Sequence, residues 1–144
     1  MAPAAIPAFR LYGIVAILLV LKILAVANYT SYLRIRRRVN ATPEDYALQG
    51  LAARGTVDPD IERVRRAHQN DLENILPFLI IGLVFALTGP SIVPAAIYFI
   101  GFLVARVLHS VFYIASLQPH RTVAFALGGA FLVVMMVHTF IRLL

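Results

Sequence analysis

Residues 62–90, ERVRRAHQNDLENILPFLIIGLVFALTGP, change from densely charged to wholly apolar within one helical pattern, and this change indicates the fold class. Charged and polar side chains fill it up to Glu73, and residues 75–87 carry no charge. This pattern is typical of a helix that enters a bilayer. Arg66, Asn70 and Glu73 are spaced four and three residues apart, which places them along one stripe of that helix.

Two interpretations of this stripe stay open. A carboxylate, an amide and a guanidinium in line at the edge of the hydrocarbon, where ionisable groups are costly, indicate a site for a polar ligand. The alternative is a solvated face beside the membrane, with basic residues that anchor the helix end.

The composition excludes an ordinary soluble domain. The chain has 144 residues, of which 60% are apolar and 14% charged, and this balance is typical of a membrane protein. The net charge of +6 indicates orientation and contact with anionic headgroups rather than nucleic-acid binding, because no aromatic residues alternate with the basic ones to stack bases. The chain has no cysteine, so any thiol chemistry needs a thiol brought by a substrate.

Four apolar segments approach the roughly 20 residues that are needed to cross a bilayer. Lipid forbids open sheet edges and no segment alternates as barrel strands do, so we expect one all-α domain over 1–144, a bundle of four transmembrane helices. Thr42 and Asp58 each precede a proline, which predicts two helix starts in the polar connection. The predicted helices cover about 8–36, 61–88, 92–116 and 121–142, and the connection covers about 39–59.

The charges predict how the bundle lies in its membrane. Ten of the thirteen basic residues and all seven acidic residues fall on the side of the first and third connections. The positive-inside rule makes that side cytosolic and places both termini in the lumen. Lys22 lies within the first predicted helix, so we expect it to face the bundle, to pair with a partner or to reach toward the interface.

Polar residues converge at the cytosolic mouth of the bundle. Arg106, His109 and Tyr113 share one helix face, while Arg34 ends the first helix and Arg121 opens the fourth. An excess of cations with a few acceptors suits a ligand that carries carboxylates and an ammonium group, and glutathione has two carboxylates, one amine and one thiol. A free thiol has a pKa of about 8.5, so catalysis needs a group that favours the thiolate.

Arg121 and Thr122 open a predicted helix, where a guanidinium, a hydroxyl and backbone amides at the positive end of the dipole could stabilise a thiolate. This arrangement favours the reaction of a thiol with lipophilic electrophiles in the bilayer. The alternative is that Arg106 and Arg121 are interfacial anchors, His109 is a packed helix histidine and Tyr113 belongs to an aromatic belt. No metal site is expected, because His109 has no second metal-binding residue at a suitable spacing.

Several motifs in the chain resemble a known membrane family. The chain carries, in this order, LRIRRRVNATPED, ERVRRAHQNDLENILPF, GLVFALTGP and ARVLHSVFY. Together these motifs resemble the MAPEG family, the membrane-associated proteins of eicosanoid and glutathione metabolism, in its branch of microsomal glutathione transferases and prostaglandin E synthases. The resemblance covers most of the chain, roughly residues 17–127.

The resemblance implies a homotrimer of four-helix subunits, with glutathione bound at each subunit interface near the cytosolic face. It also implies a multi-pass protein of the endoplasmic reticulum, with the mitochondrial outer membrane as an additional location. The implied catalytic residues are Arg121, which stabilises the thiolate, Thr122 beside it, and Asp45, which matches an aspartate proposed to act in the prostaglandin synthase chemistry. The implied glutathione contacts are Arg34, His68, Asn70, Glu73, Arg106, His109, Tyr113 and Arg121.

Departures from the family pattern favour one activity over the other. Tyr46 stands where transferases of this branch often carry a reactive cysteine, so activation by thiol modification is not expected. Gln69, Thr122 and Phe125 stand where the prostaglandin synthase has a basic residue, a serine and a tyrosine. We therefore expect a transferase that joins glutathione thiolate to lipophilic electrophiles, with peroxidase activity toward lipid hydroperoxides as an additional expectation. The alternatives are a prostaglandin E synthase-type isomerase with glutathione as cofactor, and a non-catalytic lipid-binding scaffold.

Overall fold

The computed structural model describes residues 7–52 and 58–144, so positions 53–57 of the expected connection lie outside the described residues. Within the described ranges all regular secondary structure is helical, which confirms the predicted all-α class. The helices are α1 (Pro7–Arg37), α2 (Pro43–Leu48), α3 (Pro59–Leu87), α4 (Ile92–Ile114) and α5 (His120–Leu143). Of these helices, α1, α3, α4 and α5 are long and apolar enough to cross a membrane.

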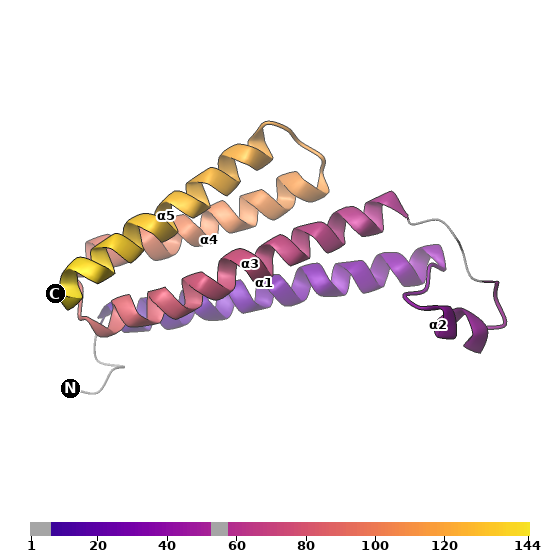
Figure 1. Cartoon of the computed structure of the whole chain (residues 1–144), viewed down its shortest axis with the longest axis horizontal. Helices are drawn as coiled ribbons and strands as arrows, with labels where there is room; N and C mark the ends of the chain where they lie inside the picture. Colours follow the sequence, from indigo (N-terminus) through magenta and orange to yellow (C-terminus); the bar gives the residue numbers. More distant parts are fainter. Residues whose placement is uncertain (1–6, 53–57) are drawn as a thin grey trace.

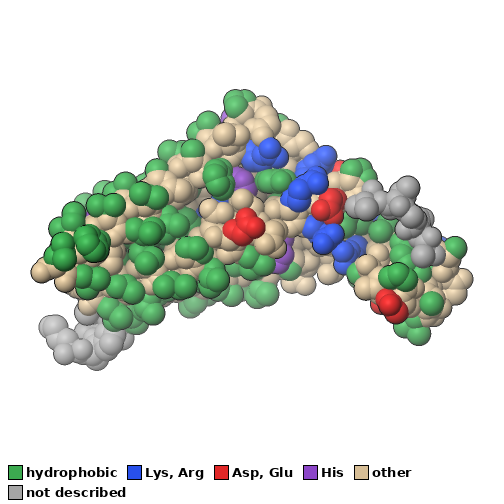
Figure 2. Space-filling model, in the orientation of Figure 1, with side chains coloured by type: hydrophobic (Ala, Val, Ile, Leu, Met, Phe, Trp, Pro, Cys, Tyr) green, Lys and Arg blue, Asp and Glu red, His purple; other side chains and the backbone are tan. Residues whose placement is uncertain are grey.

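The two central helices are α3 and α4, and each packs against the other three long helices. Figure 1 shows α1 and α3 side by side, with the α4–α5 hairpin laid against them. The ends of α1 and α3 extend past this hairpin toward α2 (Figure 1). In Figure 2, Lys and Arg side chains gather toward the same end, while the rest of the visible face is largely hydrophobic.

Side-chain caps are present at both of the helix starts that were predicted in the polar connection. The Thr42 hydroxyl accepts from Asp45 N at 3.4 Å, and the Asp45 carboxylate accepts from the Thr42 N–H at 3.3 Å, which closes a capping box around the start of α2. Asp58 caps α3 by accepting from the N–H groups of Asp60 and Ile61 at 3.0 and 3.1 Å. Both predicted starts are confirmed.

Two helix ends differ from the expected bounds by two residues. Helix α3 begins at Pro59, because Asp58 supplies the cap immediately before it. Helix α4 ends at Ile114, because Ser116 has a positive φ of 61°, which a continuing right-handed helix does not allow.

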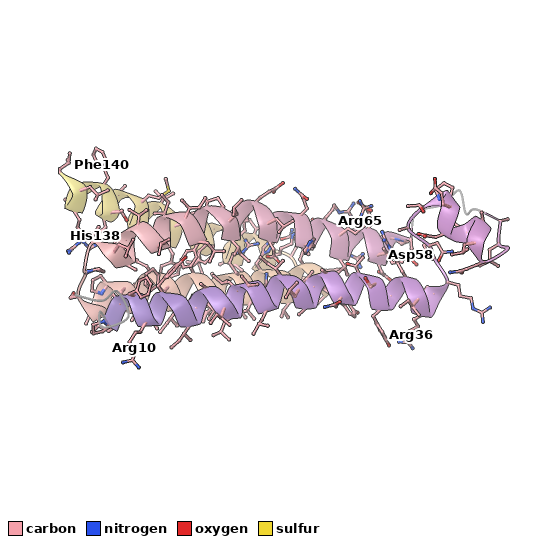
Figure 3. All side chains as sticks on the ribbon, turned by 90° about the horizontal axis from the view of Figure 1, so that it is seen from below. Arg10, Arg36, Asp58, Arg65, His138 and Phe140 are labelled. Carbon is pink, nitrogen blue, oxygen red and sulfur yellow. The ribbon has the colours of Figure 1, made fainter. Side chains whose placement is uncertain are left out.

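Two arginines tie helices together at opposite ends of the bundle. Arg37 at the end of α1 donates to both carboxylate oxygens of Asp58, at 2.7 and 2.8 Å. The Arg37 guanidinium thereby holds the pKa of the Asp58 carboxyl below its ordinary value. At the other end, Arg142 of α5 donates to the hydroxyl and to the carbonyl oxygen of Thr88, each at 2.9 Å. Figure 3 labels Asp58 near α2 and His138 at the opposite end.

The core between α1, α3 and α4 is aromatic. Phe78 of α3 stacks on Phe102 of α4, with ring centroids 4.0 Å apart and planes 4° from parallel. Phe99 meets both Phe78 and Phe85 edge to face, and all four rings are fully buried. Many large apolar side chains on the outer faces of the long helices are exposed, as is typical of helices surrounded by hydrocarbon.

Candidate functional site

A charged cluster lies inside the bundle where α1, α3 and α4 meet. Asp71 of α3 and Arg106 of α4 are completely buried, and Arg106 Nη2 donates to Asp71 Oδ1 at 2.7 Å. Lys22 of α1 forms an ion pair with the same carboxylate and donates to Ser110 Oγ at 2.6 Å. Ser110 in turn donates to Asp71 Oδ2 at 3.1 Å. The expectation that Lys22 faces the bundle and pairs is confirmed, with Asp71 as its partner. We call these four residues the Lys22–Asp71–Arg106 cluster.

The cluster forms because two charged residues occupy otherwise apolar helix stripes that face each other. A charge within a bundle-facing stripe needs a partner, since an unpaired one is costly in a medium of low dielectric. Asp71 and Ser110 are not among the site residues predicted from the sequence, because that prediction on α3 rests on the stripe of Arg66, Asn70 and Glu73. The available signal was the acidic residue within the buried stripe of α3, which contains Ala67, Asp71, Ile75 and Phe78, opposite Phe99, Phe102, Arg106 and His109 on α4.

Arg106 connects this cluster to the predicted binding residues. Its Nη2 also donates to Asn70 Oδ1 at 2.7 Å. Its Nε and Nη1 are buried and have no hydrogen-bond partner among the described residues. His109, on the next turn of α4, likewise has a buried Nδ1 without a partner within 7–52 and 58–144. The two side chains therefore have hydrogen-bonding capacity left for a polar ligand.

Tyr113 and Arg121 continue this polar face to the turn between α4 and α5. The His109 and Tyr113 rings meet edge to face at 5.5 Å, and the Arg121 guanidinium carbon lies 4.5 Å from the Tyr113 ring centroid. In the amide orientation that satisfies both neighbours, Gln118 accepts from Arg121 Nε at 2.9 Å and donates to Thr122 Oγ1 at 3.0 Å. Arg121 is partly exposed at the start of α5, so its position is restrained while it stays accessible. We call Arg106, His109, Tyr113 and Arg121 the α4–α5 polar face.

Arg34 and His68 line a different groove, of about 460 Å³, between α1 and α3. Arg65 lines the same groove, so it is strongly basic. Glu73 is exposed on α3 and accepts a hydrogen bond from Gln69 at 3.1 Å. In the described part of a single chain, no hydrogen bond or ion pair joins Arg34, His68 or Glu73 to the α4–α5 polar face.

Asp45 occupies a third position, in the first turn of α2. Its carboxylate is exposed and serves the capping box, and it lines a groove of about 410 Å³ together with Arg34 and Arg38. One chain thus places the predicted site residues in separate groups. Asn70, Arg106, His109, Tyr113, Arg121 and Thr122 lie together along α3, α4 and α5, whereas Arg34, His68, Glu73 and Asp45 lie outside this group.

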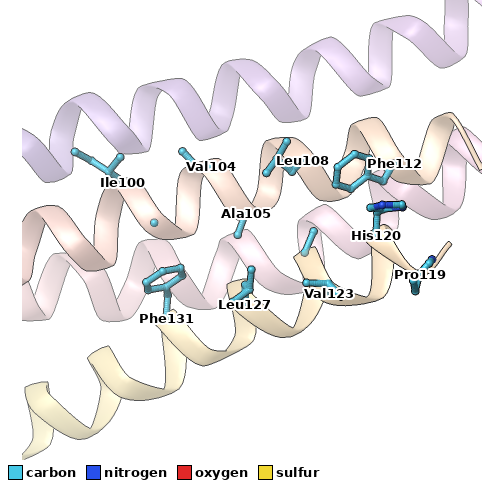
Figure 4. A pocket seen from close by; sticks show the side chains of 12 residues that line it. Ile100, Val104, Ala105, Leu108, Phe112, Pro119, His120, Val123, Leu127 and Phe131 are labelled. Atoms are coloured by element: carbon cyan, nitrogen blue, oxygen red, sulfur yellow. The ribbon is translucent and has the colours of Figure 1, made fainter. Parts of the chain in front are cut away.

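An apolar groove of about 400 Å³ follows the seam between α4 and α5. In Figure 4, Phe112 and His120 lie toward one end of it and Phe131 toward the other. The Phe131 ring packs directly against the backbone of Gly101, where a Cβ would lie only 2.5 Å from the ring. His120 immediately precedes Arg121, so the groove begins next to the α4–α5 polar face.

The sequence profile of the MAPEG family matches residues 12–141. The chain belongs to the MAPEG family. It is 42% identical over 129 residues to human prostaglandin E synthase, which covers 89% of this chain and 83% of that protein. It is 40% identical over 125 residues to microsomal glutathione S-transferase 1 of Sus scrofa, which covers 83% of this chain and 81% of that protein. As a MAPEG protein with four long apolar helices in its described part, it is an integral membrane protein.

Proposed function

We propose that this MAPEG protein is a glutathione S-transferase that joins the thiolate of glutathione to lipophilic electrophiles from the bilayer. The observation that carries the proposal is the position of Arg121. Its guanidinium lies at the positive end of α5, 4.5 Å from the Tyr113 ring, and on the same polar face as the buried donors of Arg106. Similarity to a protein named microsomal glutathione S-transferase 1 supports the choice of thiol.

The positive charges of the α4–α5 polar face are complementary to the negative groups of glutathione. Arg106 has free donors for a carboxylate, and Arg121 places a second positive charge beside the helix start, where a thiolate is favoured over a thiol. In the reaction, the thiol proton leaves to solvent and the sulfur lone pair forms a bond to the electrophilic carbon. The bond between that carbon and its leaving group breaks, and the leaving group takes the electron pair.

We further propose that the complete site forms between two subunits of a homotrimer. One chain carries two polar halves: the α4–α5 polar face, and the α1–α3 groove with Arg34 and His68. The ends of α1 and α3 extend past the α4–α5 hairpin (Figure 1), so they are available to a neighbouring chain. A head-to-tail contact of one half with the other closes into a ring of three when each subunit is rotated by a third of a turn from the last.

Mixing two inactive variants tests this arrangement. Arg121→Ala and Arg34→Ala chains, each inactive alone, should regain activity when coexpressed, because some interfaces then combine two intact halves. Random assembly of equal amounts makes about one quarter of the interfaces complete. If both halves came from the same chain, every site would contain one substitution and no activity would return.

The apolar groove between α4 and α5 is the place we assign to the lipophilic substrate. Its lining is almost wholly hydrocarbon, its volume is about 400 Å³, and it begins at the residue before Arg121. An electrophile dissolved in the bilayer can therefore lie along the seam with its reactive carbon toward the thiolate. By the same chemistry, a lipid hydroperoxide would be reduced to an alcohol and water while two glutathiones are oxidised to the disulfide.

The second candidate function is that of a glutathione-dependent prostaglandin E synthase. The 42% identity to the human enzyme of that name favours it, and so does the carboxylate of Asp45 beside Arg34. In such an isomerisation glutathione is regenerated, whereas the transferase consumes it. Thr122 and Phe125, two of the departures described above, favour the transferase.

We propose the endoplasmic reticulum as the membrane of this protein, with the basic end of the bundle in the cytosol.

The thiolate itself provides a direct test of the Arg121 assignment. Glutathione bound at neutral pH should show the ultraviolet absorbance of a thiolate in the wild-type protein. Arg121→Ala should bind glutathione without this signal. Arg142→Ala, which changes an arginine at the other end of the same helix, serves as the control and should keep it. An undiminished thiolate signal in Arg121→Ala would remove Arg121 from this role.

A further inference from the structure

The Lys22–Asp71–Arg106 cluster holds two cations and one carboxylate inside the bundle. The side chain of Lys22 is 11% exposed, and those of Asp71 and Arg106 are not exposed at all. Two positive charges and one negative charge leave a net charge of +1 in a region of low dielectric. Such an excess is costly unless an anion offsets it.

Arg106 is the member of the cluster through which an anion can bind. Its Nη2 already donates to Asn70 and to Asp71, each at 2.7 Å, and these two contacts restrain the guanidinium. Its Nε and Nη1 stay without a partner among the residues described, although both atoms are buried. On the far side of the cluster, Lys22 and Ser110 both bind Asp71, so the carboxylate is itself held in place.

We propose that Asp71 is a positioning residue for ligand binding, which orients Arg106 so that its free N–H groups meet one carboxylate of glutathione. Lys22 acts one step further away, because it restrains Asp71. The carboxylate of the ligand also brings the net charge of the cluster from +1 to zero, so binding and charge balance are linked. This inference rests on the proposed function and adds two residues to it that themselves touch no ligand.

The test measures the dissociation constants of three ligands: glutathione and two analogues, each with one of its two carboxylates converted to an amide. The main variant is Lys22→Met with Asp71→Asn, which removes one cation and one anion and therefore keeps the net charge of the cluster at +1. Any change in carboxylate recognition then comes from the position of Arg106 and not from charge. Arg106→Lys is the reference variant, because it lacks the guanidinium.

In the wild-type protein, one of the two amides should bind weaker than glutathione by on the order of tenfold, the value of a charge-assisted hydrogen bond. In the double variant this ratio should fall below about threefold, and in Arg106→Lys it should be lost. A merely structural role for Asp71 would weaken all three ligands by one factor and leave the ratio unchanged, which would overturn the inference. An unchanged ratio in Arg106→Lys would overturn it as well.

If the double variant does not fold, Asp71→Glu provides the same test. The longer side chain keeps the negative charge and displaces Arg106, so the ratio should fall in the same way. A wild-type protein that binds no glutathione overturns the proposed function and this inference with it, whereas wild-type binding with an unchanged ratio in the variants overturns only the role of Asp71.

Discussion

Removal of the Asp71 carboxylate should destabilise the bundle strongly. Asp71 is completely buried, accepts from Arg106 at 2.7 Å and from Ser110 at 3.1 Å, and pairs with Lys22. Removal of one partner from a buried ion pair costs about 3–5 kcal/mol. In Asp71→Ala two buried cations lose the same partner, so we expect the free energy of unfolding to fall by an amount near the upper end of that range.

The matched change at the other end of the ion pair should have a much smaller effect. Lys22→Met leaves Asp71 and Arg106 as a neutral pair, so no buried charge loses its only partner and the cost of an uncompensated charge does not arise. The double variant Lys22→Met, Asp71→Ala should lie between the single variants, because only one cation is then unpaired. This order of the free energies of unfolding is expected only if both cations share the Asp71 carboxylate.

The assay is the free energy of unfolding in mixed micelles, measured by titration with a denaturing detergent and followed by the loss of helical circular dichroism. All variants are compared in the same lipid and detergent mixture. If the free energy of unfolding of Asp71→Ala lay within about 1 kcal/mol of the wild-type value, the two cations would not depend on this carboxylate, which would contradict the prediction. A Lys22→Met variant as unstable as Asp71→Ala would refute the charge balance on which the order rests.

Three further predictions concern the mouth of the bundle and the groove. Glu73→Ala should weaken glutathione binding about tenfold, and an unaltered dissociation constant would place Glu73 outside the site. Arg37 lowers the pKa of Asp58, so the stability that this pair contributes is present above the ordinary carboxyl pKa and is lost as pH falls through the lowered pKa. Arg37→Met should therefore make the free energy of unfolding depend less on pH on the acid side. An unchanged pH dependence would contradict the coupling of the two residues. Leu127→Trp should fill the apolar groove and raise KM for a bulky electrophile severalfold without changing glutathione binding, while Leu143→Trp, at the end of the same helix, should leave KM unchanged.

The helices could be predicted from the sequence because their signals are local. Hydrophobic runs identify the membrane spans, and Thr42 and Asp58, each followed by a proline, mark the two starts in the connection. These features depend on neighbouring residues alone, so no knowledge of the packing is needed. The left-handed residue Ser116, which ends α4, carries no comparable local signal, and the predicted end was two residues too far.

The partners of the buried charges could not be predicted in the same way, because they depend on how separate helices pack. Asp71 is adjacent to Asn70 in the sequence, and Arg106 donates to both, but Asp71 belongs to the buried stripe of α3 and also pairs with Lys22. The spacing of Arg66, Asn70 and Glu73 therefore led to the neighbouring face. Spacing along one helix defines a face, but it does not say which other helix covers that face.

The division of the candidate site has a similar cause. Arg34 and Arg121 end and begin helices at one mouth of the bundle, so the sequence indicated a common site. In one chain they lie on different surfaces, because Arg34 lines the groove between α1 and α3, whereas Arg121 contacts Tyr113 where α4 meets α5. Helix order fixes the end of the bundle at which a residue lies. Which two surfaces meet depends on the assembly.

Glutathione consumption by the detergent-purified protein, with a lipophilic aryl halide as acceptor, measures the proposed transferase reaction itself. We expect consumption with one conjugate formed per glutathione, lost by at least about a hundredfold in Arg121→Ala and retained in Arg142→Ala. The absence of conjugate from a wild-type protein that still binds glutathione would contradict the transferase assignment. Conjugate formation at the wild-type rate by Arg121→Ala would contradict the role of Arg121.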